Sequence, residues 1–572
     1  MSRQNLIRFS LLACLISMQA NTVVAEELKA TLRRPVALLA GRGDTLIVAN
    51  QRSGSLSIVD LKTRRVVDEH FVAASIADAA ALPVGTTVVV LDDQENSVKQ
   101  VTLSPGRAQV TTLMKLKGQP TKLAVDIENR RLLFTQKWQH TVRALQFNRD
   151  WQQVLAVQDV ELSFAPRDIL LLPNLKQLVV AAAFGGRLGL LDAASLKIIS
   201  QREIDGHNIR GLAVAPDGKR FHVTHQQFVP DTLADYEELH WGRMMSNAIQ
   251  TFDIGDLTKP GSNLLTGFLD EYGGIGGAMA DPSGVVTGPD RLSAVAFAGV
   301  GEVAVRQRGT DRRIRVQAGP DAMLAQGTSL YVANRFADSI SEIDLSQGKV
   351  TNTISLGPTP AMNAVDRGEK LFFDARLSHD GWLSCHSCHT DGHSAGLLVD
   401  TLGDGDYGAP KRIPSLLGTR DTAPWGWTGK STSLEQQIRK SVTTTMHGDP
   451  LSQQQVDDLV AYLKSLKSPP ARNSASTSAK QGQQVFQRNR CSSCHSGKTF
   501  TSDGVYDVGL SDERDRRSFN PPSLLGVSHR PQLFHDARAK SLRAVINQFQ
   551  HQLKRPLSEQ DSKALLAYLK SL

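Results

Sequence analysis

The chain has 572 residues, and its 65 basic and 57 acidic side chains give a net charge of +8, with both signs interspersed along the sequence. This length allows three or four domains of about 150 residues, or fewer if one is a large β-domain, and it excludes a small disulfide-stapled scaffold. The interspersed charge is typical of a soluble protein with a modest preference for acidic partners, and it argues against nucleic-acid binding.

The first 25 residues have the order of a cleavable secretory signal. Arg3 and Arg8 precede an apolar run from Phe9 to Met18, and Ala25 ends a small-residue cleavage site. The apolar run is too short to span a bilayer. A lipobox-like order ends at Cys14, but few apolar residues precede it. We therefore favour cleavage after Ala25 over lipid anchoring at Cys14.

Residues 27–357 repeat short β-branched runs that are separated by turn residues. Their spacing is close to the four-strand period of a propeller blade, except where an insertion lengthens the fifth interval. The segment from Leu330 to Gly357 closely resembles the YVTN type of β-propeller repeat, which implies a seven-bladed ring. The seven runs are TLIVAN from Thr45, TTVVVLDD from Thr86, RRLLFTQ from Arg130, KQLVVAAA from Lys176, KRFHVTH from Lys219, LSAVAFAG from Leu292 and SLYVANR from Ser329.

The propeller does not reveal its own role. It can be a docking platform for a protein partner, which we favour, or it can hold a ligand in its channel. The insertion, roughly Gln226 to Ser283, contains histidines and methionines, which can bind copper or haem iron, but we expect a solvated loop with ordinary packing residues. The residues concerned are His222 and His225 just before the insertion, and His240, Trp241, Met244 and Met245 within it.

Two c-type haem attachment motifs follow, CHSCH from Cys385 and CSSCH from Cys491. In such a motif two thiols bond to one haem, and the next histidine binds the iron as proximal ligand. A four-cysteine zinc site and a redox dithiol also use Cys-x-x-Cys pairs, but neither explains a histidine after both pairs. The sequence predicts two covalently bound haem c groups, and hence export to a bacterial periplasm. The attachment thiols are Cys385, Cys388, Cys491 and Cys494, and the proximal ligands are His389 and His495.

The haem motifs head two copies of one mainly α-helical cytochrome c pattern. PSLLG occurs from Pro414 and again from Pro522, and AYLKSL ends both copies. We expect a first cytochrome c domain over residues 361–466, a linker rich in Pro, Ser and Ala over 467–480, and a second cytochrome c domain over 481–572. An amphipathic helix beginning near Ser452 or Ser558 closes each copy and packs against its haem-bearing partner.

Four stretches of residues 361–572 carry a resemblance to a known family: EKLFFDARLSHDGWLSCHSCH, PSLLGTRDTAPWGWTGKSTSLEQQ, CSSCHSGKTFTSDGVYDVG and PSLLGVSHRPQLFHDARAKSL. They resemble the bacterial di-haem cytochrome c peroxidases and their MauG-type relatives. The resemblance implies that peroxide reacts at the amino-terminal haem and that the carboxy-terminal haem relays electrons. A YVTN-type propeller ahead of such a pair resembles a less characterised branch of that family.

The resemblance also implies catalytic residues. Trp427 matches a tryptophan that would sit between the haems and help electrons cross, although it can instead be a core aromatic against a haem edge. Gln437 matches the family's distal glutamine. His447 stands where the family has its catalytic glutamate, Ser441 replaces a proline, and the loop that supplies a labile ligand to the first haem is missing. Arg412 replaces an asparagine that helps hold calcium, which puts a calcium site in doubt.

The distal iron ligands remain open. Met446 or His447 can ligate the first haem, His447 can instead be an acid and base above an open iron, or both can be ordinary loop residues. On the second haem the family's axial methionine falls at Gln548, a poor ligand. His551 can substitute, because it lies three residues further along the expected helix.

Three other histidines lie near the haem motifs. His535 matches a family histidine, although Ala537 replaces the glycine two residues later. We expect His393 to be a surface residue or a haem-propionate neighbour, and His386, inside the first motif, to be exposed.

Three functions fit these patterns. The first is a periplasmic di-haem peroxidase or MauG-type oxidoreductase that uses hydrogen peroxide or a related oxidant and draws electrons from a small soluble redox protein or a bound substrate. The second is an electron-transfer cytochrome whose two irons are both six-coordinate. In the third, the propeller docks the haem pair to a partner protein, which is compatible with either of the others.

Overall fold

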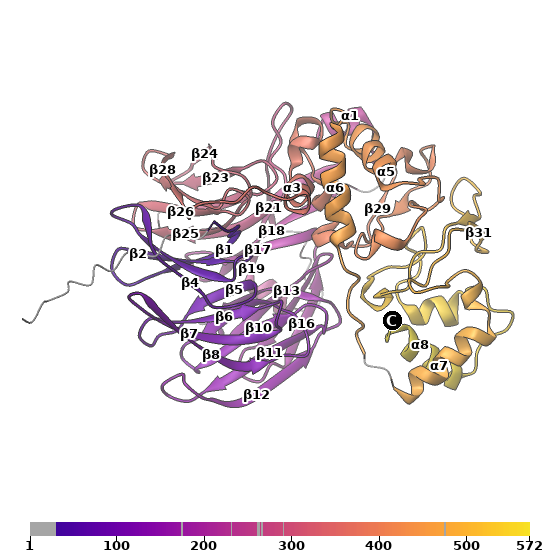
Figure 1. Cartoon of the computed structure of the whole chain (residues 1–572), viewed down its shortest axis with the longest axis horizontal. Coiled ribbons are helices and arrows are strands. Elements are labelled where there is room, and N and C mark those ends of the chain that lie inside the picture. The colour runs from indigo at the N-terminus through magenta and orange to yellow at the C-terminus, as the bar shows by residue number, and fades with distance from the viewer. Residues whose placement is uncertain are drawn as a thin grey trace, which may run out of the picture.

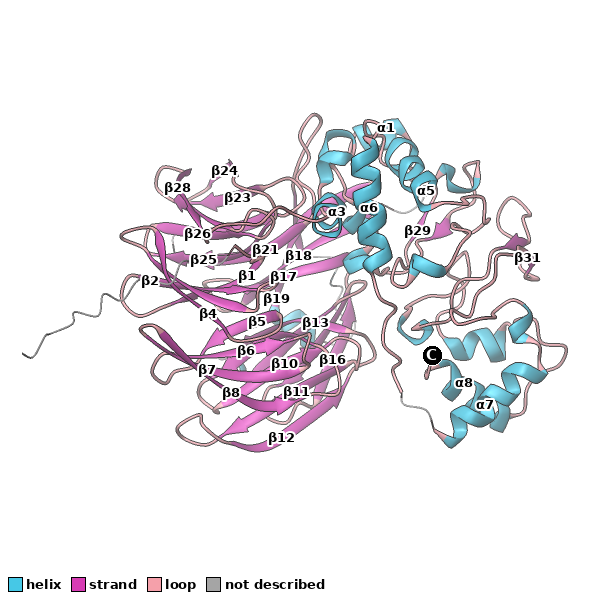
Figure 2. Cartoon of the chain, viewed as in Figure 1, coloured by secondary structure: helices cyan, strands magenta, loops and turns pink. Residues whose placement is uncertain are grey.

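The computed structural model describes residues 30–172, 175–229, 232–259, 264, 267–289, 291–473 and 476–572. The predicted signal over residues 1–25, with Cys14, lies outside this part. Among the described helices, none is long and apolar enough to cross a membrane. The β-propeller packs beside two mainly helical parts (Figures 1 and 2), which we call the first module, residues 361–466, and the second module, residues 476–572.

Seven four-stranded antiparallel sheets form the propeller, which confirms the predicted architecture. Every predicted run is the second strand of its sheet, where neighbouring sheets bury both faces. The strands of the seven sheets, in chain order, are β1 (Pro35–Ala40), β2 (Thr45–Asn50), β3 (Ser55–Asp60), β4 (Arg65–Phe71); β5 (Ile76–Ala81), β6 (Thr87–Asp92), β7 (Ser97–Ser104), β8 (Arg107–Lys115); β9 (Pro120–Asp126), β10 (Arg131–Gln136), β11 (Thr141–Phe147), β12 (Val154–Glu161); β13 (Pro166–Leu172), β14 (Gln177–Ala182), β15 (Arg187–Asp192), β16 (Ile198–Glu203); β17 (His207–Val214), β18 (Arg220–Phe228), β19 (Met245–Asp253), β20 (Phe268–Glu271); β21 (Pro282–Gly288), β22 (Leu292–Phe297), β23 (Glu302–Gln307), β24 (Thr310–Arg315); and β25 (Pro320–Gln326), β26 (Ser329–Asn334), β27 (Ser339–Asp344), β28 (Lys349–Ser355).

The ring closes by packing and not by exchange of a strand. Each sheet uses four consecutive strands, and the first strands of neighbouring sheets contact one another around the centre, including β1 with β25. Leu46 and Tyr331 meet in the apolar cluster between the first and last sheets. The carboxylate of Asp338 accepts hydrogen bonds from the backbone N–H groups of Arg33 and Arg34, at 3.0 and 2.8 Å. Closure therefore buries the facing surfaces of the first and last sheets.

The insertion in the fifth sheet lies against the first module and is not the solvated loop that we expected. It contains the short helices α1 (Tyr236–His240) and α2 (Ile254–Thr258). Met244 and Met245 are each only 1% exposed and belong to one apolar cluster with Trp382 of the first module. The two methionines are packing residues, as expected, but what they pack against is another part of the chain.

Each module is built from short helices and turns around its own pair of packed helices. The first pair is α3 and α6, and the second is α7 and α8. The helices are α3 (Ala364–Phe372), α4 (Cys385–Cys388), α5 (Leu434–Lys440), α6 (Gln453–Ser465), α7 (Thr477–Arg488) and α8 (Glu559–Leu569), the π-helical turns are η8 (Ser441–Thr445) and η11 (Ala544–Gln548), and the short strand pairs are β29 (Leu398–Val399) with β30 (Lys411–Arg412) and β31 (Tyr506–Asp507) with β32 (Ser518–Phe519).

The closing helices begin where the sequence predicts. Ser452 caps α6 and Ser558 caps α8, each side chain accepting a hydrogen bond from a backbone N–H in the first turn. A glycine of the partner helix lets each pair approach closely. A Cβ on Gly368 would lie 1.9 Å from the carbonyl oxygen of Asp458, and one on Gly482 would lie 2.0 Å from that of Ala564. The two modules therefore share one packing scheme.

Candidate haem sites and the interface between them

The first motif is held on α4, a single turn of helix. Ser384 caps this turn and presents Cys385 and Cys388, which His389 follows directly. The Nδ1–H of His389 donates a hydrogen bond to the carbonyl oxygen of Pro414 at 2.9 Å, which leaves Nε2 as the ring nitrogen with a free lone pair. Burial lowers the pKa of His389 to about 4, so the ring is neutral at neutral pH. A neutral imidazole with a fixed tautomer is the form that binds iron.

The second motif repeats this arrangement. The Nδ1 of His495 lies 3.2 Å from the carbonyl oxygen of Phe500, and burial lowers its pKa to about 4. Cys491 packs with the core of the second module, whereas Cys385 and Cys388 pack with that of the first. Among the described residues, no group of three or more possible metal ligands includes a cysteine. A shared four-cysteine zinc site is therefore not supported, and each motif has the donor set that a haem c group requires.

The propeller covers the first motif, so the prediction that His386 is exposed is wrong. His386 is only 2% exposed, and the guanidinium of Arg210 packs against its ring. Asp391 accepts hydrogen bonds from Arg210 at 2.7 Å and Arg167 at 2.8 Å, while Lys137 lies 3.7 Å away. Although burial opposes it, these cations hold the pKa of Asp391 well below its usual range. The motif is thus fixed by charges from two innermost strands, β13 and β17.

A second contact fastens the same turn to the propeller. The carboxylate of Asp281, just before β21, accepts hydrogen bonds from the hydroxyls of Ser384 at 2.6 Å and Ser387 at 2.7 Å. His207 Nε2 lies 2.9 Å from the carbonyl oxygen of Ser387. In the second motif, Ser493 at the corresponding place is exposed. The propeller thus covers His386 and Ser387 of the first motif, whereas the serine that corresponds to Ser387 in the second motif faces solvent.

Gln437 and His447, two predicted catalytic residues, have different neighbours. The Oε1 of Gln437 accepts a hydrogen bond from Ser431 at 2.6 Å, and its Nε2 donates to Ser441 at 3.2 Å. His447 instead points to the propeller insertion, where its Nε2 lies 3.0 Å from the carbonyl oxygen of Ala234. Met446 is 4% exposed and belongs to the apolar cluster that Cys385 and Cys388 also contact. The structure therefore separates Met446, which faces the core, from His447, which faces the insertion.

In the second module, His551 lies against the core that the second motif contacts. Its ring packs on Phe534, with centroids 5.2 Å apart, and both Phe534 and Cys491 pack against the apolar cluster of that module. The Nδ1 of His551 is buried and has no hydrogen-bond partner among the described residues. The expectation that His551 continues the helix of Gln548 is wrong, because η11 ends at Gln548 and the chain turns at Gln550, where φ is 44°. Gln548 itself is exposed.

The two π-helical turns show which positions correspond. After η8 the N–H of Gly448 donates to Val442 at 3.0 Å, and after η11 the N–H of His551 donates to Val545 at 3.1 Å. Gly448 therefore occupies the place of His551. A Cβ on Gly448 would lie 1.8 Å from the carbonyl oxygen of Leu377, so a side chain there is excluded. The two modules differ most sharply at this candidate ligand position.

The interface between the modules has approximate two-fold symmetry. The N–H of Arg412 donates to the carbonyl of His535 at 2.6 Å, and the N–H of Asn520 donates to the carbonyl of Trp427 at 2.8 Å. In the repeat that relates the two PSLLG segments, Arg412 corresponds to Asn520 and Trp427 to His535. Each module thus gives and accepts the same bond, as in a symmetric dimer.

Trp427 and His535 meet at this interface. Their ring centroids are 6.4 Å apart, and His535 also stacks on Phe519 at 3.8 Å. The Nε1 of Trp427 donates to the carbonyl of Arg412 at 2.7 Å, and the Arg412 guanidinium lies over the Trp427 ring, 5.0 Å from its centroid. Burial lowers the pKa of Arg412 to about 9. Arg412 stands where the resembled family has an asparagine that helps hold calcium, and its guanidinium is buried.

His393 is also buried, at 1% exposed, and is not a surface residue. Its Nδ1 lies 2.8 Å from the hydroxyl of Ser415, and its ring packs on Phe184 and Trp138 of the propeller. His529 of the second module packs on the same tryptophan, with ring centroids 5.0 Å apart. His393 thus joins both modules to the propeller.

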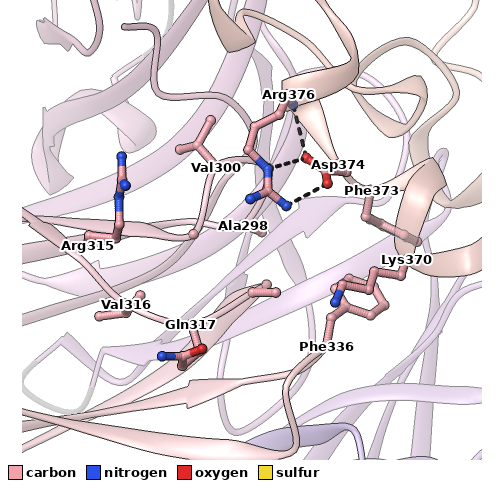
Figure 3. A pocket seen from close by; sticks show the side chains of 14 residues that line it. Ala298, Val300, Arg315, Val316, Gln317, Phe336, Lys370, Phe373, Asp374 and Arg376 are labelled. Carbon is pink, nitrogen blue, oxygen red and sulfur yellow. Dashed lines mark hydrogen bonds and ion pairs between the residues drawn. The ribbon is translucent and has the colours of Figure 1, made fainter. Parts of the chain in front are cut away.

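A cavity of about 310 Å³ opens between α3 and the last two propeller sheets. Figure 3 shows Arg376 turned onto Asp374 in this cavity, which Lys370 and Phe336 also line. None of the predicted catalytic or iron-binding residues lines this cavity. A smaller cavity shares Phe336 with it and reaches His386.

The contacts that sequence reasoning missed are those of Arg167, Arg210, Asp281 and Asp391. The first three lie more than a hundred residues before the motif that they hold. In the sequence, these three propeller residues are visible only as charged positions at or near the start of innermost strands. That pattern does not show which residues they contact.

Residues 362–486 match the family model described as di-haem cytochrome c peroxidase, and residues 479–572 match the model described as cytochrome c. The methylamine utilization protein MauG of Methylophilus methylotrophus is 25% identical over 275 residues, covering 36% of this chain and 81% of that protein. MauG of Methylorubrum extorquens is 28% identical over 271 residues, covering 36% and 76%. The cytochrome c551 peroxidase of Nitrosomonas europaea is 22% identical over 266 residues, covering 36% and 78%. The carboxy-terminal part of the chain, residues 362–572, is therefore similar to di-haem cytochrome c peroxidases and MauG proteins, and a seven-bladed β-propeller precedes it.

Proposed function

We propose that the protein is a periplasmic di-haem oxidoreductase that reduces hydrogen peroxide or a related oxidant at the first haem site and receives electrons through the second. The observation that carries this proposal is the difference between Gly448 and His551. His551 offers a buried imidazole beside the core that Cys491 contacts, whereas the carbonyl of Leu377 leaves no room for a side chain at Gly448. With haem bound in both modules, this difference would leave room for the oxidant in the first module and would give the second module His551 as a further candidate ligand.

In this proposal each haem is attached covalently. Cys385 and Cys388 hold the first and Cys491 and Cys494 the second, and His389 and His495 are the proximal ligands. The carbonyl partners of the two Nδ1 atoms support this assignment, because they fix the tautomer with Nε2 free. Export to the periplasm agrees with both the attachment chemistry and the four free cysteines.

A haem held by these residues would supply oxidant binding and one-electron chemistry. The chain must then move a proton between the two oxygens of peroxide. Gln437 is suited to orient the oxidant or a water, because Ser431 and Ser441 fix its amide. His447 is the candidate acid and base: while its Nε2 donates to Ala234, its Nδ1 carries a lone pair that can accept a proton.

Electrons would cross between the modules at Trp427 and His535. Their rings are in contact across the interface. Arg412 fixes the indole in two ways, because its backbone carbonyl accepts a hydrogen bond from the indole N–H and its guanidinium lies over the indole ring. The donor, a small soluble redox protein, would dock on the second module, because Ser493 in the second motif is exposed while the propeller covers Ser387 of the first motif. A partner protein on the propeller itself is supported by exposed apolar side chains on the outer strands β4, β8 and β12, namely Val67, Phe71, Val110, Leu155 and Val157.

The proposal is tested by peroxide consumption. Purified di-haem protein supplied with hydrogen peroxide and a reduced small cytochrome should oxidise that donor, and Gln437→Leu should slow the reaction by about 10²-fold or more if the amide takes part in proton movement. Gln436→Leu changes the exposed neighbouring glutamine and is the matched control. Failure of the protein both to consume peroxide and to change its haem spectrum on mixing would contradict the proposal.

A second candidate function is electron transfer without catalysis, and the position of Met446 favours it. Met446 is buried in the cluster that Cys385 and Cys388 contact, and methionine is a usual sixth ligand in electron-transfer cytochromes. In that case the ferric protein is low-spin at both sites, and Met446→Leu creates a high-spin signal. A high-spin signal already present in the unaltered protein would exclude this candidate.

A further inference from the structure

We propose that His240, His379 and Asp380 form a binding site for one divalent transition-metal ion, with zinc as the best-suited ion. The site lies where the propeller insertion meets the first module, since His240 ends α1 and the other two belong to η4 (His379–Gly381). Across the described ranges, no other set of three or more His, Cys, Asp or Glu brings its ligand atoms within 4.8 Å of one another. The site is separate from both haem motifs.

The three ligand atoms have the spacing of a tetrahedral site. His240 Nδ1 lies 3.0 Å from His379 Nε2 and 3.7 Å from Asp380 Oδ2, and His379 Nε2 lies 3.5 Å from the same oxygen. Zinc binds nitrogen and oxygen at about 2.0 to 2.1 Å, and tetrahedral geometry then places neighbouring ligand atoms about 3.3 Å apart. All three edges lie within half an ångström of that value, so small side-chain movements can admit an ion.

Neighbouring groups hold the ligands in this arrangement. The ring of Tyr236 stacks on His240, with centroids 5.7 Å apart and planes at 7°, and contacts His379 at 4.7 Å. The carboxylate of Asp380 accepts a hydrogen bond from the N–H of Gly276 at 2.9 Å. The backbone of Asp380 is in the left-handed region, at φ 54°, which few residues other than glycine adopt. The hydrogen bond from Gly276 thus holds the Asp380 carboxylate beside the two histidines.

The donor set and its exposure select the class of ion. Two imidazoles and one carboxylate suit Zn²⁺ and similar divalent ions, and three protein ligands leave a fourth position for water. The side chains of His240, His379 and Asp380 are 29%, 21% and 19% exposed, so an ion can reach them from solvent. In the metal-free protein the two histidines hydrogen-bond to each other.

An ion at this site ties the insertion to the first module beside the distal candidates. The N–H of His379 donates to the carbonyl of Met446 at 2.9 Å. His447 contacts the carbonyl of Ala234 and the ring of Tyr236, which also stacks on His240. Metal binding therefore stiffens the contact between the insertion and the first module next to Met446 and His447. This role is independent of whether the protein reduces peroxide.

Zinc titration of the full-length di-haem protein tests the inference. Isothermal calorimetry should give one zinc per chain, and zinc X-ray absorption should show nitrogen and oxygen ligands, without sulfur, at about 2.0 to 2.1 Å. His240→Gln and Asp380→Asn should each weaken binding by about tenfold or more. The control is His70→Gln, because His70 pairs with Asp68 at 3.0 Å on β4 and belongs to no three-ligand cluster among the described residues.

The unaltered haem spectrum and circular dichroism of each variant check that it is folded. Zinc affinity that is the same in His240→Gln and Asp380→Asn as in the unaltered protein would overturn the inference. So would zinc binding that His70→Gln weakens equally, or a sulfur ligand in the absorption spectrum.

Discussion

Replacing Asp391 by asparagine should detach the first haem motif from the propeller. The change keeps the shape of the side chain and removes its charge, while Arg167, Arg210 and Lys137 stay in place. Arg167 and Arg210 are 13% and 9% exposed and Asp391 is 22% exposed, so water screens the three charges little. Asp391→Asn therefore leaves buried cations without their anion.

The magnitude follows from that burial. Removing one partner of a buried ion pair costs about 3 to 5 kcal/mol, because the remaining charge is desolvated and uncompensated. At about 1.36 kcal/mol per factor of ten, the equilibrium for opening this contact should shift by about two to four powers of ten. An exposed pair, such as Arg220 with Asp217 at 2.7 Å, contributes about 0 to 1 kcal/mol.

Hydrogen exchange measured by mass spectrometry reads this opening locally. Peptides that span residues 384–393 report on the N–H groups of Ser387 and His389, which are bonded within the motif. Their exchange should accelerate strongly in Asp391→Asn and stay unchanged in the control Asp217→Asn. An acceleration of less than about tenfold, or one that Asp217→Asn matches, would refute the view that the charge of Asp391 holds the motif in place.

Four other predictions follow from the same contacts. Since the folded-state pKa of Asp391 is depressed, its stabilising contribution is fully present above about pH 4 and is lost as the pH falls through the folded value, so opening measured at pH 7 and pH 5 should agree after correction for intrinsic exchange. His551→Ala should convert the second haem from low-spin to high-spin in the electron paramagnetic resonance spectrum, whereas Gln548→Ala should not, because Gln548 is exposed. Cys494→Ala should weaken or abolish attachment in the second module only, which haem staining and mass measurement of the separated modules after proteolysis can show. Gly448→Ala should destabilise the first module by about 1 to 3 kcal/mol in thermal unfolding, because the added Cβ meets Leu377; an unchanged melting temperature would contradict the close approach.

The haem motifs, the seven sheets and the closing helices could be predicted from the sequence because each depends on residues close together in the chain. A CxxCH motif is complete within five residues, and the propeller follows from strand runs that recur at the period of one blade. The caps Ser452 and Ser558 act on their own first turns. In each case the residues that determine the feature lie close together in the sequence.

The position of His551 shows where local reasoning fails. A regular helix through Gln548 would carry His551 on nearly the same face, but η11 ends and the chain turns before that residue. The π-helical turn has no distinct signature in the sequence of this chain. The equivalence of His551 with Gly448 emerges only from the matching hydrogen bonds after the two turns.

What the sequence determined by itself is the inventory: two attachment motifs with their histidines, a repeated haem module and a β-propeller ahead of them. Tertiary structure alone decided the surroundings of each motif. His386 is buried and not exposed, because Arg210 and Asp391 enclose it, and Trp427 meets His535 because the two modules face each other symmetrically. The physical reason is distance along the chain, since burial and charge pairing act between residues that only folding brings together.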